Sequence, residues 1–308
     1  PENITECSWP LAQPDWSQWQ GWEGGRAQFQ SILADIQPDL IHAGPVQGPA
    51  FLAALVEFQP LLTMSWGSDL LVKAKRSPWM RYATRFTLSR TKLLLVDCQT
   101  VAKEAMGYGF PEERIILFPW GVDLGHFSPE KGNKPGQDLR HSLGWEDKFV
   151  VMCNRAWSPI YGVDVLASAF TAAAQENENL RLLLIGDGLQ SHLIRDILAP
   201  VGDKVSFPGW VNRGDLPAAY CGSDLFVSPS HSDGSSISLL EALACGRPVL
   251  ASDIPSNQEW VQPGVTGQLF KDGQVNDLKK KILQLADDHR LTQYGTEARK
   301  LAENRADW

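Results

Sequence analysis

Two carboxylates lie within one largely apolar stretch of the sequence, SDGSSISLLEALACGRPVL at residues 232–250. Asp233 sits among turn-forming residues, and Glu241 interrupts the apolar run that follows. Charged side chains are mostly exposed, so the simplest interpretation is a turn residue followed by a solvated helix position. The apolar neighbours of Glu241 leave it only a narrow polar face, however, and a carboxylate in such surroundings needs a designated polar partner. Sugar hydroxyls would serve, because an ionised carboxylate accepts two of them at once.

The residues around the two acids predict a short helix that begins just after Asp233. Ser235 or Ser236 is suited to the N-cap, residues 237–244 form the helix, and Gly246 with Pro248 ends it. Asp233 then follows the strand expected at residues 224–230, at the carboxyl end of the strands, where parallel sheets bind ligands. The first-turn amides of the helix are a natural place for a phosphate group.

Short apolar strands alternate with amphipathic helices along the chain, which predicts an α/β protein built on parallel sheets. Residues 131–144 (KGNKPGQDLRHSLG) are polar and contain glycine and proline, so we interpret them as a linker. We therefore expect two Rossmann-like, doubly wound units: an N-terminal domain at 1–130, a linker at 131–146 and a C-terminal domain at 147–308. The Trp- and Pro-containing opening segment is expected to be irregular, with the first domain incomplete at its start.

The expected elements can be stated by residue range. Strands are expected at 39–44, 61–66, 92–98, 114–123, 149–156, 180–186, 204–211, 224–230 and 249–252, and helices at 26–36, 49–58, 163–176, 215–222, 237–244 and 276–286.

Composition excludes several classes of protein. The 308 residues carry a formal net charge of −8, and a general nucleic-acid binder needs a basic excess to displace counterions from phosphates. The 5 cysteines are scattered without a Cys-x-x-Cys pair, so neither a zinc site nor a disulfide framework is indicated. No apolar stretch approaches the length of a membrane span, and the first residues are not a signal peptide. We expect a soluble, cytoplasmic protein with buried thiols at Cys98, Cys153 and Cys245.

Several short motifs, in a fixed order, resemble those of the retaining GT-B glycosyltransferases of the family 4 type (glycosyl transferases group 1). The acid-x7-acid element from Asp233 to Glu241 is followed by Ala244-Cys245-Gly246 and Pro248-Val249. Any one piece is weak, but the likeness covers nearly the whole chain. Further matches are Asn154-Arg155, Gly162-Val163-Asp164, Gly186-Asp187-Gly188, Phe207-Pro208-Gly209, Ser228-Pro229-Ser230, Glu259 with Gly264 and Gly267, and, in the first half, Pro38 to His42, Gly67-Ser68-Asp69, Gly121-Val122-Asp123 and Phe127-Ser128-Pro129.

The resemblance implies a role for each matching residue. Glu241 would hold the ribose hydroxyls of a nucleotide-sugar donor, Asp233 would contact the transferred sugar, and Arg155 would neutralise the diphosphate as the glycosidic bond breaks. For Arg155 considered without its neighbours, a surface ion pair is an equally good explanation. The implied catalytic residues are thus Asp233, Arg155 and Glu241, and the implied donor-binding residues are Gly188, Gly209, Trp210, Val211, Gly234, Ser235, Ser236, Ile237 and Glu241.

The implied activity is transfer of a sugar from a nucleotide diphosphate sugar, with retention of configuration, to a glycan, a lipid-linked acceptor or a small molecule. A UDP-sugar is the first guess for the donor and a GDP-sugar the next, and no cofactor is expected. No Asp-x-Asp occurs in the sequence, so we expect no metal. The donor base, the sugar, the acceptor and the oligomeric state stay open.

The sequence departs from the family pattern in three places, and two of them, the missing lysine and the missing first loop, favour an alternative. Tyr161 replaces the lysine that usually precedes the glycine equivalent to Gly162, and Ser65-Trp66 stands where a histidine is common. Nothing before Ala27 resembles the family's first strand and glycine-rich loop, and the customary C-terminal helix is cut at Trp308. The alternative is a catalytically weak module that binds a nucleotide sugar or a partner. A dinucleotide-dependent oxidoreductase is disfavoured, because no G-x-G-x-x-G follows a strand.

A basic stretch with interleaved aromatic residues is unusual in this acidic protein. Residues 72–96 contain seven Lys or Arg and no acid, with Trp79, Met80, Phe86 and Leu88 between them. Such a segment could contact anionic lipid or a lipid-diphosphate acceptor at the inner face of a membrane. The competing interpretation is an ordinary solvated helix that packs its aromatic side chains inward.

Overall fold

The computed structural model describes residues 19–307, which divide into two compact units. The N-terminal unit comprises residues up to Val96 together with Val101–Phe118, and the C-terminal unit comprises Asp97–Thr100 together with the residues from Pro119 onward. The expectation of two α/β units with separate parallel sheets is confirmed. The chain passes between the units at residues 96–97, 100–101 and 118–119.

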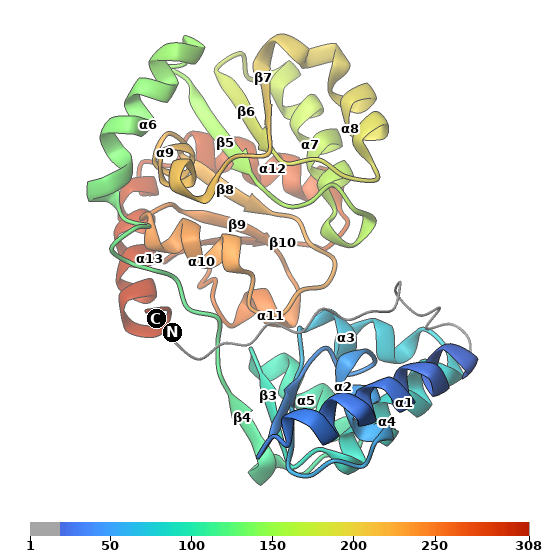
Figure 1. Ribbon diagram of the computed structural model, residues 1–308. Coiled ribbons are helices and arrows are strands. Elements are labelled where there is room, and N and C mark those ends of the chain that lie inside the picture. The colour runs from blue at the N-terminus through green and yellow to red at the C-terminus, as the bar shows by residue number, and fades with distance from the viewer. Residues whose placement is uncertain (1–18, 308) are drawn as a thin grey trace. The chain divides into compact units, whose positions relative to one another are not determined.

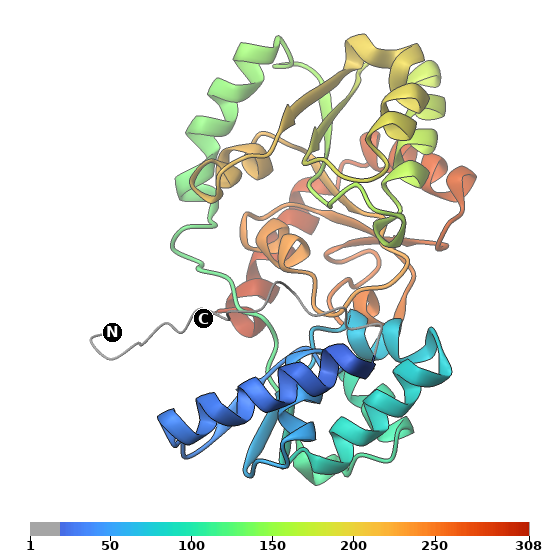
Figure 2. The same cartoon turned by 45° about the vertical axis from the view of Figure 1, so that its right-hand side comes forward.

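The N-terminal unit contains a four-stranded parallel sheet in the order β1-β2-β3-β4 (Figures 1 and 2). Its strands are β1 (Ile41–Ala43), β2 (Leu61–Met64), β3 (Leu93–Val96) and β4 (Ile115–Leu117). The helices along this part of the chain are α1 (Trp19–Ile36), α2 (Pro49–Leu55), α3 (Ser68–Leu71), α4 (Pro78–Arg90) and α5 (Gln99–Gly107), with short 3-10 turns at Lys73–Lys75 and Glu112–Arg114.

Helix α4 forms the middle of the basic stretch at residues 72–96. Ser77 caps it by accepting the Met80 N–H at 3.1 Å, and Pro78 occupies the first turn, where its missing N–H costs nothing. The rings of Trp79 and Phe86 pack edge-on against Phe51 of α2, with centroids 5.7 and 5.5 Å apart. The interpretation of an amphipathic helix with its aromatic side chains inward is therefore confirmed for these two residues.

The Gly67-Ser68-Asp69 motif has a structural role. Asp69 is fully buried, and its carboxylate accepts hydrogen bonds from the Ser65 hydroxyl and from the Val46, Trp66 and Leu70 amides. Those donors satisfy an ionised carboxylate that would otherwise be costly to bury. The aspartate thus ties the loop after β1 to the turn after β2.

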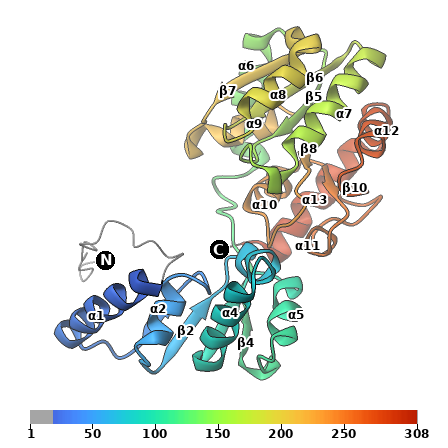
Figure 3. The same cartoon turned by 90° about the vertical axis from the view of Figure 1, so that its right-hand side faces the viewer.

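The C-terminal unit contains a six-stranded parallel sheet in the order β10-β9-β8-β5-β6-β7 (Figures 1 and 3). The strands are β5 (Phe149–Cys153), β6 (Leu180–Ile185), β7 (Val205–Gly209), β8 (Leu225–Ser228), β9 (Val249–Ser252) and β10 (Gly267–Phe270). The chain builds outward through β6 and β7, then returns so that β8 pairs with the other edge of β5. A topological switch point therefore lies between β5 and β8.

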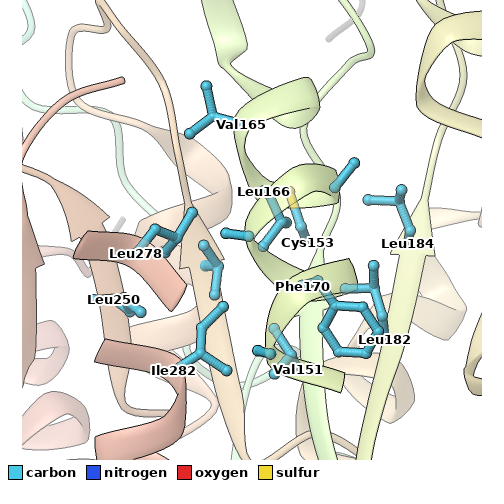
Figure 4. Close-up of a cluster of buried hydrophobic side chains, with 14 of the residues drawn as sticks. Val151, Cys153, Val165, Leu166, Phe170, Leu182, Leu184, Leu250, Leu278 and Ile282 are labelled. Carbon is cyan, nitrogen blue, oxygen red and sulfur yellow. The ribbon is translucent and has the colours of Figure 1, made fainter. Parts of the chain in front are cut away.

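Helices cover both faces of this sheet because its central strands are apolar on both sides. Val151, Cys153, Leu182 and Leu184 face one core, where Leu166 and Phe170 of α7 and Leu278 and Ile282 of α12 pack (Figure 4). The alternate residues Val150, Met152, Leu183 and Ile185 face a second core shared with α9, α10 and α13. The helices of this unit are α6 (Pro129–Leu143), α7 (Val163–Glu176), α8 (Ser191–Leu198), α9 (Leu216–Cys221), α10 (Ile237–Ala244), α11 (Pro255–Gln258), α12 (Val275–Ala286) and α13 (Leu291–Arg305), with 3-10 turns at Pro159–Tyr161, Ala199–Lys204 and Arg213–Asp215.

Residues 131–143, in the segment interpreted as a linker, are helical. They belong to α6, which Ser128 caps by accepting the Lys131 N–H, and which ends at Gly144 in the left-handed conformation. Its glycines allow close packing on α9: a Cβ built on Gly132 would lie 2.3 Å from the Cys221 Sγ, and one on Gly136 would lie 2.5 Å from the Gly222 amide nitrogen. Tertiary packing overrides the low helix propensity of glycine here.

Other differences from the sequence-based expectation concern helices. Helix α1 begins at Trp19, inside the segment expected to be irregular. Helices α5, α8 and α13 and strand β10 were not expected. Trp9, Trp16 and Cys7 lie outside the described residues, whereas Cys98, Cys153 and Cys245 are buried thiols as expected. Among residues 19–307, no helix combines the length and the apolar character that crossing a bilayer requires.

We expect Gly132→Ala to destabilise the C-terminal unit by about 2 kcal/mol, because the added methyl group overlaps the Cys221 sulfur and the Pro217 carbonyl oxygen at 2.5 Å. Urea unfolding measures the change. The matched control is Gly214→Ala, whose Cβ would meet nothing within 4 Å. Equal stability of the two variants would show that α6 and α9 are not packed this closely.

Candidate functional site

The sequence-predicted site residues lie in loops that follow the strands of the C-terminal sheet at their carboxyl ends. Arg155 follows β5 and Asp233 follows β8, so these two residues flank the switch point between neighbouring strands. Gly188 follows β6, and Gly209 ends β7. In open α/β sheets this edge, and this point on it, is where ligands bind.

Arg155 is the centre of the polar contacts at the switch point. Its Nη2 lies 2.6 Å from the Asp233 Oδ2, and its Nη1 donates to the Ser236 and Ser238 hydroxyls at 2.8 and 3.0 Å. The guanidinium also lies 4.3 Å from the ring centroid of Tyr161, within cation–π range. Tyr161 therefore supports Arg155 from the position where the family usually has a lysine.

The two candidate N-cap serines do not cap α10 through their side chains. Ser236 occupies the N-cap position, but its hydroxyl accepts from Arg155 rather than from a helix amide. Ser235 donates its hydroxyl to the Asp97 carbonyl oxygen at 2.7 Å. The amides of Ser236 and Ile237 are consequently left without an acceptor among residues 19–307, so they point to a place for an external anion.

Two opposing effects act on the pKa of Asp233. Its burial raises its pKa, and the positive charge of Arg155 opposes that rise. The side chains of Arg155 and Asp233 are only 11% and 16% exposed. The ion pair is therefore poorly screened by solvent, and removal of either partner leaves the other uncompensated.

Glu241 lies on α10, and one of its two carboxylate oxygens is hydrogen-bonded within the protein. The residue is 8% exposed, and its Oε2 accepts the Tyr220 hydroxyl at 2.7 Å, whereas its Oε1 accepts no hydrogen bond from residues 19–307. Burial raises the pKa of Glu241, while the bond from Tyr220 and the charges of Arg213 and His126 act against the rise. The solvated helix position considered from the sequence is thus wrong for Glu241.

Asp97 is a site residue that the sequence reasoning missed. It is 3% exposed, its Oδ2 accepts the Ser235 N–H at 2.8 Å, and its Oδ1 is buried without a partner among the described residues. A Cβ on Gly234 would lie 2.0 Å from the Asp97 Oδ2, so only glycine fits there. Burial raises the pKa of Asp97, and the nearby Asp233 adds to the rise. Its signal was available, because an acid at the end of an apolar strand occupies the carboxyl edge of a sheet.

A second group of predicted residues surrounds a hollow between the loops after β6 and β7. Gly188 and Trp210 line this cavity of about 470 Å³ together with Leu189 and His192. Trp210 is 78% exposed, whereas the Val211 side chain packs into the core. Gly188 is required sterically, since its Cβ would lie 2.5 Å from the Trp157 carbonyl oxygen. Trp210 is thus open to solvent, whereas the half-buried Val211 side chain packs against the core.

Metal ligation has no support from side-chain clusters. Within residues 19–307, no three His, Cys, Asp or Glu side chains come together in a way that could hold a metal ion.

Comparison with known proteins shows what the chain is similar to. Residues 147–288 match the family described as glycosyl transferases group 1, and residues 18–98 match glycosyl transferase 4-like domains. The chain is similar in structure to HepE from Anabaena in complex with UDP-glucose, with a TM-score of 0.79 and 24% identity over 92% of this chain and 78% of that one. It is also similar to sucrose-phosphate synthase from Thermosynechococcus elongatus, with a TM-score of 0.77, 22% identity and coverage of 94% and 75%. The architecture is that of the GT-B glycosyltransferases.

The chain is also similar in sequence to curated transferases. Sulfoquinovosyl transferase SQD2 of Arabidopsis thaliana is 27% identical over 90% of this chain and 56% of its own length. D-inositol 3-phosphate glycosyltransferase of Gordonia bronchialis is 30% identical over 68% of this chain and 48% of its length. A GDP-mannose-dependent phosphatidylinositol monomannoside mannosyltransferase of Mycobacterium tuberculosis is 27% identical over 63% of this chain and 52% of its own length. The chain spans about half the length of these relatives.

We expect Arg155→Gln to destabilise the C-terminal unit by about 3 kcal/mol at neutral pH, because it leaves the Asp233 carboxylate buried without its cation. The loss should shrink as the pH falls, since Asp233 without Arg155 has a still higher pKa and becomes neutral on protonation. Urea unfolding at several pH values measures this. Adding Asp233→Asn to Arg155→Gln should restore part of the stability, and strictly additive losses would contradict the ion pair.

Proposed function

We propose that this chain binds a nucleotide diphosphate sugar and transfers the sugar, with retention of configuration, to a glycan, lipid-linked or small-molecule acceptor. The observation that carries the proposal is the group formed by Arg155, Asp233 and the first turn of α10 at the switch point between β5 and β8. An always-charged guanidinium, two amides without acceptors and a partly buried carboxylate suit a diphosphate that is bonded to a sugar.

Donor binding would exchange partners within this group. The diphosphate oxygens would take the place of the Asp233 carboxylate beside Arg155, which can bond two oxygens at once. Asp233 would then be free to accept hydroxyls of the sugar. The exchange keeps both buried charges compensated, whereas loss of either partner alone would not. The ion pair of the free protein thus holds the site together until the donor arrives.

Glu241 and the hollow near Trp210 suggest where the remaining parts of the donor would lie. The Glu241 Oε1, which accepts no hydrogen bond from residues 19–307, would take the ribose hydroxyls, while Gly188, Gly209 and Trp210 would meet the base. A UDP-sugar is our first candidate and a GDP-sugar the second. The similarity to a structure that contains UDP-glucose supports the first, and the GDP-mannose-dependent relatives support the second.

The chemistry we propose needs no covalent enzyme intermediate and no metal. As the bond between the sugar and the diphosphate breaks, negative charge grows on the leaving phosphate, and Arg155 together with the Ser236 and Ile237 amides would stabilise it. The leaving phosphate would accept the proton of the acceptor hydroxyl, which attacks from the same face and so retains the configuration. With tyrosine at position 161, Arg155 would carry more of this charge stabilisation than in a site with a second cation.

We expect the protein to bind UDP, in a calorimetric panel that also includes GDP and ADP, and Glu241→Gln to weaken the preferred nucleotide at least tenfold, about 1.4 kcal/mol. Lys280→Gln, an exposed charge change on α12, is the control. Affinity and turnover should be the same with and without EDTA. Binding without any sugar transfer or hydrolysis would favour the alternative of a catalytically weak binding module, and failure to bind any nucleotide would refute the proposal.

We also propose peripheral contact with an anionic membrane surface through residues 72–96. Lys73, Arg76, Arg81 and Arg85 are exposed, and Val72 and Tyr82 are exposed apolar neighbours at 39% and 51%. A cytoplasmic protein that receives a lipid-linked acceptor would meet it at such a surface.

We expect the protein to co-sediment with vesicles that contain anionic lipid but not with neutral vesicles. Arg81→Gln with Arg85→Gln should reduce the bound fraction several-fold, because each cation near an anionic surface is worth about 1 kcal/mol. Lys280→Gln with Lys300→Gln removes the same charge from the C-terminal unit and serves as the control. If the protein binds neither type of vesicle, the proposed membrane contact is refuted.

A further inference from the structure

A chain of three polar side chains links the end of β5 to Glu241. The Asn154 Nδ2 donates to the Tyr220 hydroxyl at 2.8 Å, and the Tyr220 hydroxyl lies 2.7 Å from the Glu241 Oε2. Asn154 immediately precedes Arg155, Tyr220 lies on α9 and Glu241 lies on α10. Three separate elements of the C-terminal unit therefore meet at one hydroxyl group.

The direction of these bonds follows from the donor inventory. An amide NH₂ only donates, so Asn154 fixes the Tyr220 oxygen as an acceptor and leaves its single proton for another partner. The Ser238 carbonyl oxygen is 3.1 Å away, but the Glu241 carboxylate is closer at 2.7 Å, and a bond to a charged acceptor is stronger. The proton of Tyr220 is thus directed at Glu241.

The core around Tyr220 does not require its hydroxyl. The ring is fully buried and packs against Phe127 and Phe226, with centroids 6.1 and 5.6 Å apart. A phenylalanine would make the same apolar contacts without bringing a polar group into the core. A buried hydroxyl is costly unless it is bonded, so its presence calls for an explanation beyond packing.

We propose that Tyr220 is a positioning residue for Glu241: it binds one carboxylate oxygen so that the other faces the ribose hydroxyls of the donor, and Asn154 fixes the orientation of the tyrosine. This inference rests on the proposed donor binding and names the residue that determines how the ribose is recognised. Tyr220 itself does not touch the donor in this arrangement.

The same hydrogen bond affects the ionisation of Glu241. Burial raises the pKa of Glu241, the Tyr220 bond opposes the rise, and Arg213 and His126 oppose it through their charges. Removal of the hydroxyl should raise the pKa further. Because the ribose hydroxyls need the ionised carboxylate, donor affinity is retained above this pKa and lost as the pH falls through it. In Tyr220→Phe the loss should therefore begin at a higher pH.

The test compares two nucleotides that differ only in the ribose hydroxyls. Calorimetry measures the affinities of UDP and 2′,3′-dideoxyuridine diphosphate for the wild-type chain and for Tyr220→Phe. We expect Tyr220→Phe to bind UDP about tenfold more weakly and the dideoxy nucleotide within twofold of the wild type. The acid limb of UDP binding should also move to higher pH. Asn154→Ala should show the same ligand dependence with a smaller loss.

Tyr294→Phe is the matched control. Tyr294 is 1% exposed in the same unit, and its hydroxyl reaches Asp288 rather than Glu241. This variant should bind both nucleotides as the wild type does. An equal loss for both nucleotides in Tyr220→Phe would show a merely structural role, and no loss would also overturn the inference. If the wild-type chain binds GDP or ADP instead of UDP, the comparison uses that nucleotide and its 2′,3′-dideoxy form. If the wild-type chain binds no nucleotide, the proposed function itself fails. That result differs from one in which the wild type binds a nucleotide but Tyr220→Phe does not show the expected selective loss.

Discussion

The ion pair between Arg155 and Asp233 is the interaction on which the site depends. It joins the loop after β5 to the loop after β8, the two neighbouring strands between which the order of the sheet reverses. Because both side chains are largely buried, neither charge is tolerated alone. The arginine is further held by two serine hydroxyls and by the ring of Tyr161. The ion pair therefore joins the two loops without leaving either buried charge uncompensated.

Close backbone approaches shape the loops around this pair. Gly234 lies directly against the Asp97 carboxylate, and a Cβ on Gly162 would lie 2.2 Å from the Pro229 carbonyl oxygen. Gly162 also has φ +59°, a conformation that glycine adopts without strain. These glycines of the site motifs make room for other parts of the protein itself, as Gly188 does beside the backbone of Trp157.

Helix α10 connects the two parts of the site. Its first turn presents amides to the switch point, and its middle carries Glu241, which Tyr220 of α9 holds from the side. Helix α9 in turn packs on α6 through Gly132 and Gly136, so a segment that looks like a linker supports a residue of the site from two helices away. This packing affects the pKa of Glu241. Burial raises the pKa, and the hydrogen bond from the buried Tyr220 lowers it.

The sequence by itself determined the α/β class, most strands of both sheets, helix α10, and the positions of Asp233 before that helix and Glu241 within it. These features depend on local patterns: apolar periodicity, turn residues and spacing along a helix. It could not determine that residues 129–143 are helical, because glycine has a low helix propensity. The helix forms here because its glycines allow close packing against α9. Nor could the sequence reveal the bonds of Arg155 to Ser236 and Ser238, of Asp97 to Ser235 or of Tyr220 to Glu241, which join residues far apart in the chain. The Arg155 contacts exist because the neighbouring parallel strands β5 and β8 bring their carboxyl ends to one edge of a sheet. Tyr220 and Glu241 meet because helices α9 and α10 pack in one core, so tertiary structure alone decides which side chains come together.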